Sequence, residues 1–402
     1  MKPRVLSGMR PTGALHLGHY HGALKNWVRL QDEFDSFFFV ADWHALTTHY
    51  EERGVMERYV YDMVTDWLAA GLDPDKCTIF IQSRLPEHAE LFTLLAMGTP
   101  LGWLERVPTY KDQIEKLKDR DLATYGFLGY PLLQAADILI YKAAYVPVGG
   151  DQSSHVELTR EVARRFNHLY GRSTDHEALT TAALAKLSKD DARYFEKQRK
   201  AYGESGGAEA LAKGEAIIAR AAAASAGWTR DDSELLQGRL RGAGKTILVE
   251  PGALHTEVKT LPGLDGEKMS KSYGNAIAMR EEPAVVKQKI QTMPTDPARV
   301  RRSDPGNPER CPVWKLHQVY SGADTQDWVV KGCTSAGIGC LECKQPVIEA
   351  ILKEQAPWRE RAAAYLSNPK QVHWIVEVGT ERARSVARET MREVRNAMGL
   401  SY

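Results

Sequence analysis

Two short segments of this chain combine imidazole, ammonium, hydroxyl and glycine in patterns suited to binding phosphate. The first segment contains His16-Leu17-Gly18-His19, follows the apolar run Val5-Leu6-Ser7-Gly8, and precedes residues with helical spacing. A strand, a turn and a helix start in this order leave unpaired backbone amides facing an anion, and two imidazoles can donate hydrogen bonds to phosphate oxygens. Gly18 lets a ligand approach the backbone closely.

The second segment is Lys268-Met269-Ser270-Lys271-Ser272, which places two ammonium groups and two hydroxyls on five residues close to several glycines. Such a loop can swing over a polyphosphate and clamp it, because its charges face the phosphate oxygens. The two segments together predict a phosphate-handling site assembled from both ends of a domain-sized stretch.

The elements that position these segments are predicted from three short apolar runs at residues 4–7, 37–41 and 78–82, separated by stretches with helical spacing. Alternating strands and helices predict an α/β fold with a Rossmann-like, doubly wound parallel sheet. Ligands of such sheets bind beyond the carboxyl ends of the strands. The residues expected there are Ser7, Gly8, Asp42, His44 and Gln82.

Length and composition describe a multidomain globular chain. Its 402 residues are 43% hydrophobic and 26% charged, with a formal net charge of +1. No run approaches the roughly 20 apolar residues that a membrane span needs, and the first residues lack an apolar signal core, so we expect a cytoplasmic protein without membrane contact. The low net charge argues against a chain that coats nucleic acid without specificity, but permits a local basic patch.

Changes in composition divide the chain into three predicted parts. Residues 1–171 and 246–280 form the catalytic domain, and residues 172–245, which are rich in alanine, charge and glycine, form an insertion that is partly helical and mobile at its glycines. Residues 281–402 read as mainly helical. Within them we expect a helix with Thr380 as N-cap and Gly399 at its end.

A polar face is predicted on the otherwise apolar segment Tyr130 to Tyr141. Pro131 suits the first turn of a helix, and Tyr130, Gln134, Asp137 and Tyr141 then recur at helical offsets. A buried carboxylate must be paired, so Asp137 is expected to accept a hydrogen bond from a donor on the ring of a ligand. Both the indole N–H of tryptophan and the phenol O–H of tyrosine qualify.

Four of the five cysteines are grouped at Cys311, Cys333, Cys340 and Cys343. In a cytosolic protein such a group indicates a metal site rather than disulfides. Only one Cys-x-x-Cys pair is present, and thiolate clusters tolerate varied spacing, which favours an iron–sulfur cluster over a structural zinc ion without excluding zinc.

The two motifs, in this order, resemble the HIGH and KMSKS signatures of class I aminoacyl-tRNA synthetases. Further stretches resemble the bacterial tryptophanyl-tRNA synthetases, and with the motifs the likeness covers nearly everything outside residues 172–245. These stretches are Ser7–Gly13, Asp42–Ala45, Tyr130–Leu139, Val146–Gln152 and His155–Arg160. A subset of that family has a similar cysteine group that binds a cluster of four iron and four sulfur atoms near the anticodon-binding region.

The resemblance implies a homodimer that activates tryptophan with ATP and Mg²⁺ and transfers it to tRNA(Trp), with residues 281–402 as the anticodon-binding domain. The residues given catalytic roles on the phosphates are His16, His19, Lys268 and Lys271. The expected ATP contacts are Arg10, Thr12, Gly18, His19, Asp151, Lys268, Met269, Ser270, Lys271 and Ser272. The expected tryptophan contacts are Leu6, Gly8, His44, Tyr130, Gln134, Asp137, Val146, Val148 and Gln152, with Asp137 accepting the indole N–H. The cluster ligands are Cys311, Cys333, Cys340 and Cys343, which we expect to lie far from the adenylate site, and the nearby Arg299, Arg301, Arg302 and Arg310 are candidate contacts for RNA phosphates.

Two departures from the family pattern keep alternatives open. Gln134 stands where methionine is common, and with Asp137 it resembles the Gln-x-x-Asp pair of tyrosyl enzymes, so tyrosine remains the alternative substrate. Gly150 stands where many members have glutamate. Outside the family, a small-molecule nucleotidylyltransferase shares the first motif and a lysine-rich loop but lacks the helical region after Ser272, and a non-catalytic RNA-binding relative would have lost motif residues.

Overall fold

A computed structural model of the chain describes residues 2–50, 54–107, 124–149, 153–172, 175–224, 227–242, 244–255 and 261–402. Its centre is a five-stranded parallel sheet with the strand order β3-β2-β1-β4-β5. The strands are β1 (Arg4–Met9), β2 (Asp35–Val40), β3 (Cys77–Ile81), β4 (Tyr145–Val148) and β5 (Gly252–His255). The first three match the predicted apolar runs, and the doubly wound α/β fold is confirmed.

The order of the strands creates a crevice at one edge of the sheet. The chain proceeds from β1 outward through β2 to β3 and then returns to the other side of β1 for β4 and β5. The strand order therefore reverses between β1 and β4, and ligands of open α/β sheets bind at such a point, outside the carboxyl ends of the strands. The peptide that follows β1 carries the first motif, so the fold brings it to this crevice.

Helices cover both faces of the sheet. The helical segments before the insertion are α1 (Leu17–His19), the π-helical turn η1 (Tyr20–Leu24), α2 (Lys25–Glu33), α3 (Asp42–His49), α4 (Met56–Ala70), η2 (Gln82–Arg84), α5 (Glu87–Gly98), α6 (Leu101–Glu105), α8 (Tyr125–Ile140) and α9 (Ser153–Tyr170). One core packs Trp27 and Trp67 against Phe38, and the other packs Tyr141 against Phe37. Because consecutive residues of β2 serve opposite cores, the strand reads as a continuous apolar run.

Helix α8 begins earlier than predicted. Its N-cap is Thr124, whose side chain accepts a hydrogen bond from the backbone N–H of Phe127, and Pro131 lies inside the helix. The prediction that Pro131 stands in the first turn is therefore wrong. A proline in a helix interior lacks the N–H that would bond four residues back, and the capping signal at Thr124 sets the start instead.

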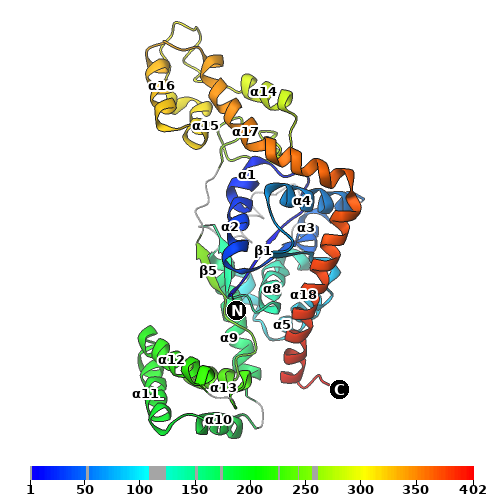
Figure 1. Cartoon of the computed structure of the whole chain (residues 1–402), viewed down its shortest axis with the longest axis vertical. Coiled ribbons are helices and arrows are strands. Elements are labelled where there is room, and N and C mark those ends of the chain that lie inside the picture. The colour runs from blue at the N-terminus through cyan, green and yellow to red at the C-terminus, as the bar shows by residue number, and fades with distance from the viewer. Residues whose placement is uncertain are drawn as a thin grey trace.

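The insertion is more regular than predicted, because its described residues contain four helices that pack around a core of their own. They are α10 (His176–Ala185), α11 (Lys189–Ser205), α12 (Ala208–Ala224) and α13 (Arg230–Leu240), and the core contains Phe195, Ile217, Ile218 and Leu236. In Figure 1 they form a separate lobe at one end of the molecule, beyond α9.

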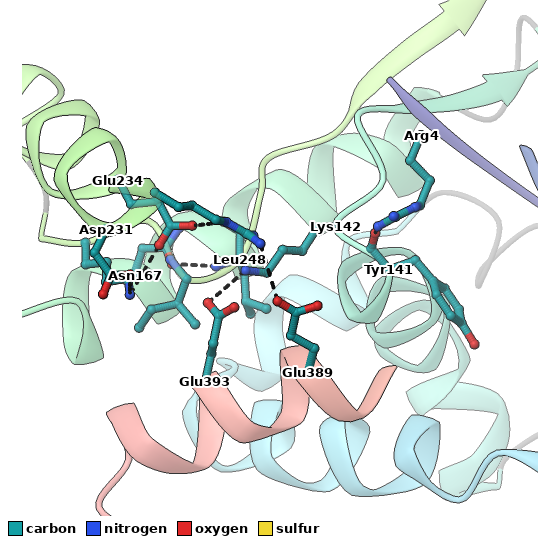
Figure 2. A network of polar contacts seen from close by, with 12 residues as sticks. Arg4, Tyr141, Lys142, Asn167, Asp231, Glu234, Leu248, Glu389 and Glu393 are labelled. Carbon is teal, nitrogen blue, oxygen red and sulfur yellow. Dashed lines mark hydrogen bonds and ion pairs between the residues drawn. The ribbon is translucent and has the colours of Figure 1, made fainter. Parts of the chain in front are cut away.

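Polar contacts join the insertion to the body of the protein (Figure 2). Arg230 of α13 pairs with Glu389 of α18 at 3.4 Å, and next to the insertion the Asn167 carboxamide bonds the backbone of Ile247 and Leu248, where the chain has returned to the body. The backbone N–H of Lys245 donates to the Gly171 carbonyl at 2.7 Å, so the chain leaves and re-enters the body that contains the sheet at neighbouring positions.

The helical region that starts at the second motif forms two separate parts of the molecule. It contains η3 (Lys271–Tyr273), α14 (Pro283–Thr292), η4 (Pro308–Arg310), α15 (Pro312–Tyr320), α16 (Ala323–Thr334), α17 (Cys340–Ser367) and α18 (Pro369–Ala397). Helices α14 to α16 and the start of α17 form a lobe at the opposite end from the insertion, whereas α18 lies along the body that contains the sheet (Figure 1). No helix of the described residues is long and apolar enough to cross a membrane.

Helix α18 also differs from its prediction. It begins at Pro369, so Thr380 is buried inside it rather than capping its start, while Gly399 does follow its end with φ +74°. Gly379 packs directly on the carbonyl of Ile79 in β3, where a Cβ atom would overlap the strand. Thr380 was misread as a cap because a buried threonine beside a glycine gives the same local signal as a helix start.

Candidate active site

A cavity of about 310 Å³ opens beside the carboxyl ends of β1 and β4. Its lining includes aromatic and apolar side chains together with a few polar groups. The lining residues that the sequence predicted are Leu6, Gly8, His44, Tyr130, Gln134, Asp137 and Val146. Gly8 of β1 has no room for a side chain, because a Cβ atom there would lie 2.5 Å from the Phe39 ring. The cavity has the size and mixed lining of a small-molecule site.

A second, more polar cavity of about 720 Å³ lies next to it and is lined by both motifs. The predicted residues that line it are Arg10, Thr12, His16, Gly18, His19, Val148, Lys268, Met269 and Ser270. Four residues at the ends of β1 and β4 line both cavities, namely Ser7, Gly8, Arg10 and Pro147. A ligand in the first cavity can therefore meet a ligand in the second at the crevice of the sheet.

Asp137 is completely buried and receives hydrogen bonds from three side chains. His44 Nε2 lies 2.8 Å from Oδ2, His88 Nδ1 lies 2.6 Å from Oδ1, and Gln82 Nε2 lies 2.9 Å from both oxygens. Burial alone would raise the pKa of the Asp137 carboxyl, but the imidazole donors outweigh it and lower the pKa, so the carboxylate stays ionised. His88 Nε2 in turn accepts from the Tyr141 hydroxyl at 2.7 Å.

The two histidines of the first motif are neutral. Burial, with a smaller effect from the Lys271 charge, lowers the pKa of His16 to about 4, and burial, with the nearby His16 and the two lysines, lowers that of His19 to about 3. His19 Nδ1 accepts the backbone N–H of His16 at 3.2 Å, so the proton of the ring is on Nε2 and can be donated. The His16 ring lies 2.9 Å from where a Cβ of Gly18 would stand, which explains the glycine between them.

The second motif lies in a hairpin that Asn275 holds together. We call residues 261–275 the lysine loop. The Asn275 carboxamide accepts the backbone N–H of Ser270 at 2.7 Å and donates to the Lys268 carbonyl at 3.2 Å and to Asp265 at 2.8 Å. Lys271 Nζ donates to the Thr12 carbonyl at 3.0 Å, and burial lowers its pKa to about 8, with Asp66 opposing that shift. Its charge therefore changes close to physiological pH.

Backbone hydrogen bonds join the first motif to residues 277–279, which follow the second motif. Leu17 N–H donates to the Ile277 carbonyl at 3.0 Å, and Met279 N–H donates to that of Leu15 at 2.9 Å. The buried Asp66 of α4 accepts from Leu15 N–H and pairs with Arg280. Two segments far apart in the sequence thus form one unit.

The four cysteines converge on a small cavity in the lobe of α14 to α17. Cys311 precedes α15, Cys333 lies near the end of α16, and Cys340 and Cys343 lie in the first turn of α17. Burial, with the other three sulfurs adding to it, raises the pKa of the Cys343 thiol to about 12, so the free thiol stays protonated at neutral pH and a metal that binds there would release the proton.

A buried cation lies beside these sulfurs. Arg299 directs Nη1 toward Cys333 Sγ at 3.9 Å and donates from Nη2 to the carbonyls of Arg302 and Ile338, while its buried Nε has no partner among the described residues. The prediction that Arg299 contacts RNA is therefore wrong, because its guanidinium is enclosed here. An anionic thiolate group fits this surrounding.

Most of the predicted site residues come together, and several important ones were missed. Asp151 and Gln152 lie outside the described residues, and of Ser272 only its place in η3 is described. Gln82, which was expected at the carboxyl end of its strand, donates to Asp137. Residues that the prediction left out include His88 on Asp137, Asn26 and Tyr273 in the larger cavity, and Asn275, and none of these gave a signal in the sequence.

Comparison with known proteins agrees with this geometry. The family model of class I tRNA synthetases (W and Y) matches residues 1–199 and 234–354. A tryptophan–tRNA ligase of Ralstonia nicotianae is 65% identical over 99% of both chains, and one of Thermotoga maritima is 44% identical over 99% of this chain and 100% of its own. A tryptophanyl-tRNA synthetase structure from Campylobacter jejuni, complexed with ADP and tryptophan, has a TM-score of 0.72 at 27% identity and covers 99% of this chain and 100% of that one.

Proposed function

Because the chain belongs to the class I tRNA synthetases of the tryptophan and tyrosine family, we propose that it is a tryptophan–tRNA ligase that acts in the cytoplasm. The observation that carries the proposal is the pair of adjoining cavities at the end of β1, one lined by aromatic side chains around Asp137 and the other by both signature motifs. Tryptophan would occupy the first cavity and ATP with Mg²⁺ the second.

The first step joins these two ligands. A carboxylate oxygen of tryptophan attacks the α-phosphorus of ATP, the bond to the bridging oxygen breaks, and pyrophosphate leaves. Arg10, which lines both cavities, is placed to hold the reacting carboxylate and phosphate together. Neutral His16 and His19 donate N–H groups to phosphate oxygens, and Lys268 and Lys271 stabilise the charge that develops on the departing pyrophosphate.

The second step transfers tryptophan from the adenylate to tRNA(Trp). The 2′-hydroxyl of the terminal adenosine attacks the carbonyl carbon, and AMP leaves. Exposed Arg301 and Arg302, beside the cysteine cavity and next to the highly exposed Val300, are candidate contacts for the distant end of the tRNA.

Recognition of the indole ring involves Asp137 and the groups around it. The carboxylate has about four lone-pair positions and already accepts from three side chains, so a fourth donor shares an oxygen with one of them. His44 also lines the cavity and is the partner able to turn toward the ligand. We assign the indole N–H to Asp137 Oδ2, the oxygen that His44 contacts, with Tyr130 and Gln152 on the ammonium group of tryptophan.

We also propose that Cys311, Cys333, Cys340 and Cys343 hold a cluster of four iron and four sulfur atoms. Four thiolates on one zinc ion lie within about 4 Å of each other, since each Zn–S bond is ~2.3 Å. No three histidine, cysteine or acidic side chains of the described residues are close enough together to hold one metal ion. The proposal rests on the four thiols that line one cavity and on the buried Arg299 beside Cys333, which suit an anionic thiolate cluster whose metal–thiolate bonds would tie together the ends of three helices.

A homodimer is proposed from an exposed apolar surface beside the first cavity. A hollow of about 450 Å³ is lined by α3, α5 and α8, and the exposed Leu46, Tyr50 and Tyr125 lie around it. Exposed apolar groups of this kind, gathered on one face, are typical of a protein interface.

The experiment that tests the function is charging of a tRNA(Trp) transcript with labelled tryptophan. We expect ATP-dependent charging that is lost when Lys268 and Lys271 are both changed to alanine. Charging with tyrosine in preference to tryptophan, or charging by the double variant at the normal rate, would contradict the proposal. The cluster is tested separately by measuring iron and zinc in protein purified without oxygen, where about four iron atoms per chain are expected.

A further inference from the structure

Helix α15 contacts residues that flank both signature segments, although it lies far from the first of them in sequence. At its first turn, Lys315 Nζ donates to the carbonyl of Gly266 in the lysine loop at 2.7 Å. At its last residue, the Tyr320 hydroxyl lies 3.1 Å from Nε2 of His21, which follows the first motif. One short helix therefore touches the elements on both sides of the phosphate cavity.

The loop tip, residues 263–267, fits closely against the start of α15. Gly266 has φ +85°, and a Cβ there would lie 3.0 Å from Pro312, so the tip turns in a conformation that favours glycine and faces the helix without a side chain between them. Gly263 N–H and the Glu267 carbonyl close the tip at 2.6 Å. Because Pro312 directly follows Cys311, this contact joins the cysteine lobe to the lysine loop.

The helix itself is firmly held. His317 is fully buried, donates from Nε2 to the Cys343 carbonyl at 3.0 Å and lies 2.8 Å from the Ser321 hydroxyl through Nδ1. Tyr320 also donates to Glu354 of α17 at 3.0 Å. A fixed helix on one side and Asn275 on the other leave the loop tip held from both directions.

From these contacts we infer that Lys315 is a positioning residue for adenylate formation: its ammonium group fixes the Gly266 carbonyl and so orients the hairpin that carries Lys268 and Lys271. This inference rests on the proposed reaction. Lys315 is exposed, so its hydrogen bond adds little to the free energy of unfolding. The hydrogen bond affects only the position of the lysine loop. Lys315 lines neither of the two cavities, so it acts through the loop.

The test uses the full chain and tryptophan-dependent ATP–pyrophosphate exchange without tRNA, with rates expressed per active site titrated by the adenylate burst. Lys315→Met keeps the length of the side chain and removes the donor, Lys315→Arg keeps a donor, and Lys331→Met is a matched control on α16. We expect Lys315→Met to lower kcat by about five- to tenfold, the effect of one hydrogen bond from a charged donor weakened by solvent. The KM for tryptophan should stay unchanged, and Lys315→Arg should recover most of the rate.

Limited trypsin digestion provides a readout that a purely structural role would not change. In Lys315→Met the bonds after Lys268 and Lys271 should be cut faster, while other sites are cut at the wild-type rate. A normal kcat in Lys315→Met, or a loss shared equally by Lys331→Met, would overturn the inference. A wild-type enzyme that exchanges no pyrophosphate would instead refute the proposed function itself.

Discussion

The network around Asp137 gives a sharp prediction for the variant Asp137→Asn. The amide keeps the shape of the side chain but replaces one acceptor oxygen with an NH₂ donor. His44, His88 and Gln82 all donate to this group, so at least one buried N–H loses its acceptor and faces another donor. An unsatisfied buried donor costs about 1–3 kcal/mol, and a bond to a charged acceptor is worth more, so the variant should be less stable by about 2–4 kcal/mol.

The pH dependence of this difference follows from the pKa of Asp137, which the hydrogen bonds from His44 and His88 lower below the ordinary value of an aspartate despite burial. A carboxyl group with a lowered pKa contributes stability that is fully present above its unfolded value and is lost as the pH falls through the folded value. The gap between wild type and variant should therefore be constant from neutral pH down to about 4. Urea unfolding at several pH values measures it, with the exposed Asp75→Asn as a matched control that should show little change.

The same variant should affect tryptophan much more than ATP. Asp137 and His44 line the first cavity and not the second, so the loss of their bond disturbs the indole position alone. A cost of about 2.7 kcal/mol corresponds to a loss of about 10²-fold in kcat/KM for tryptophan, with the KM for ATP unchanged. Gln134→Met should cost less than threefold if Asp137 accepts the indole N–H. Wild-type stability and wild-type kcat/KM in Asp137→Asn would refute the reasoning.

Three other predictions concern the phosphate side and the cysteine lobe. Because burial holds the pKa of Lys271 at about 8, kcat/KM for ATP should fall as the pH rises through 8. Lys271→Arg keeps its charge at this pH and should remove that fall. The same pH profile in the wild type and in Lys271→Arg would contradict the assignment. Asn275→Ala leaves the Ser270 N–H and the Lys268 carbonyl without their partner. The kcat of exchange should fall by about tenfold or more, with a small change in the KM for tryptophan. Equal changes in kcat and in the KM for tryptophan would indicate general unfolding. Replacing Cys340 and Cys343 by serine should abolish iron binding and weaken tRNA charging. Pyrophosphate exchange should also fall, because α15 connects the cysteine cavity to the lysine loop. Normal exchange with weak charging would show that the cluster does not affect the lysine loop.

The sequence predicts the parts of the molecule in which local signals and tertiary structure agree. The three apolar runs became β1 to β3 because a parallel sheet covered on both faces requires continuous apolar strands. The two motifs line one cavity because strand ends of a doubly wound sheet meet at one edge. Tyr130, Gln134 and Asp137 share a face of α8, as helical spacing requires.

The remaining features depend on contacts between distant segments, which a single sequence does not encode locally. Nothing near His88 indicates that its ring donates to Asp137, since its partner lies on another helix. The burial of Arg299 depends on carbonyl groups supplied by the chain around the cysteine cavity. The start of α18 at Pro369 was missed because the packing of Gly379 on β3, rather than capping, explains the Gly379-Thr380 pair.

The central claim is that the cavity around Asp137 selects tryptophan for activation by ATP in the adjoining cavity. It is tested most directly by ATP–pyrophosphate exchange measured with each of the twenty amino acids in turn. We predict rapid exchange with tryptophan and a preference over tyrosine of about 10⁴-fold, because the three side chains on Asp137 leave one acceptor position on Oδ2 for the indole N–H, and the hydroxyl of tyrosine lies at a different place on its ring. Exchange that is faster with tyrosine, or equal for the two, would contradict it.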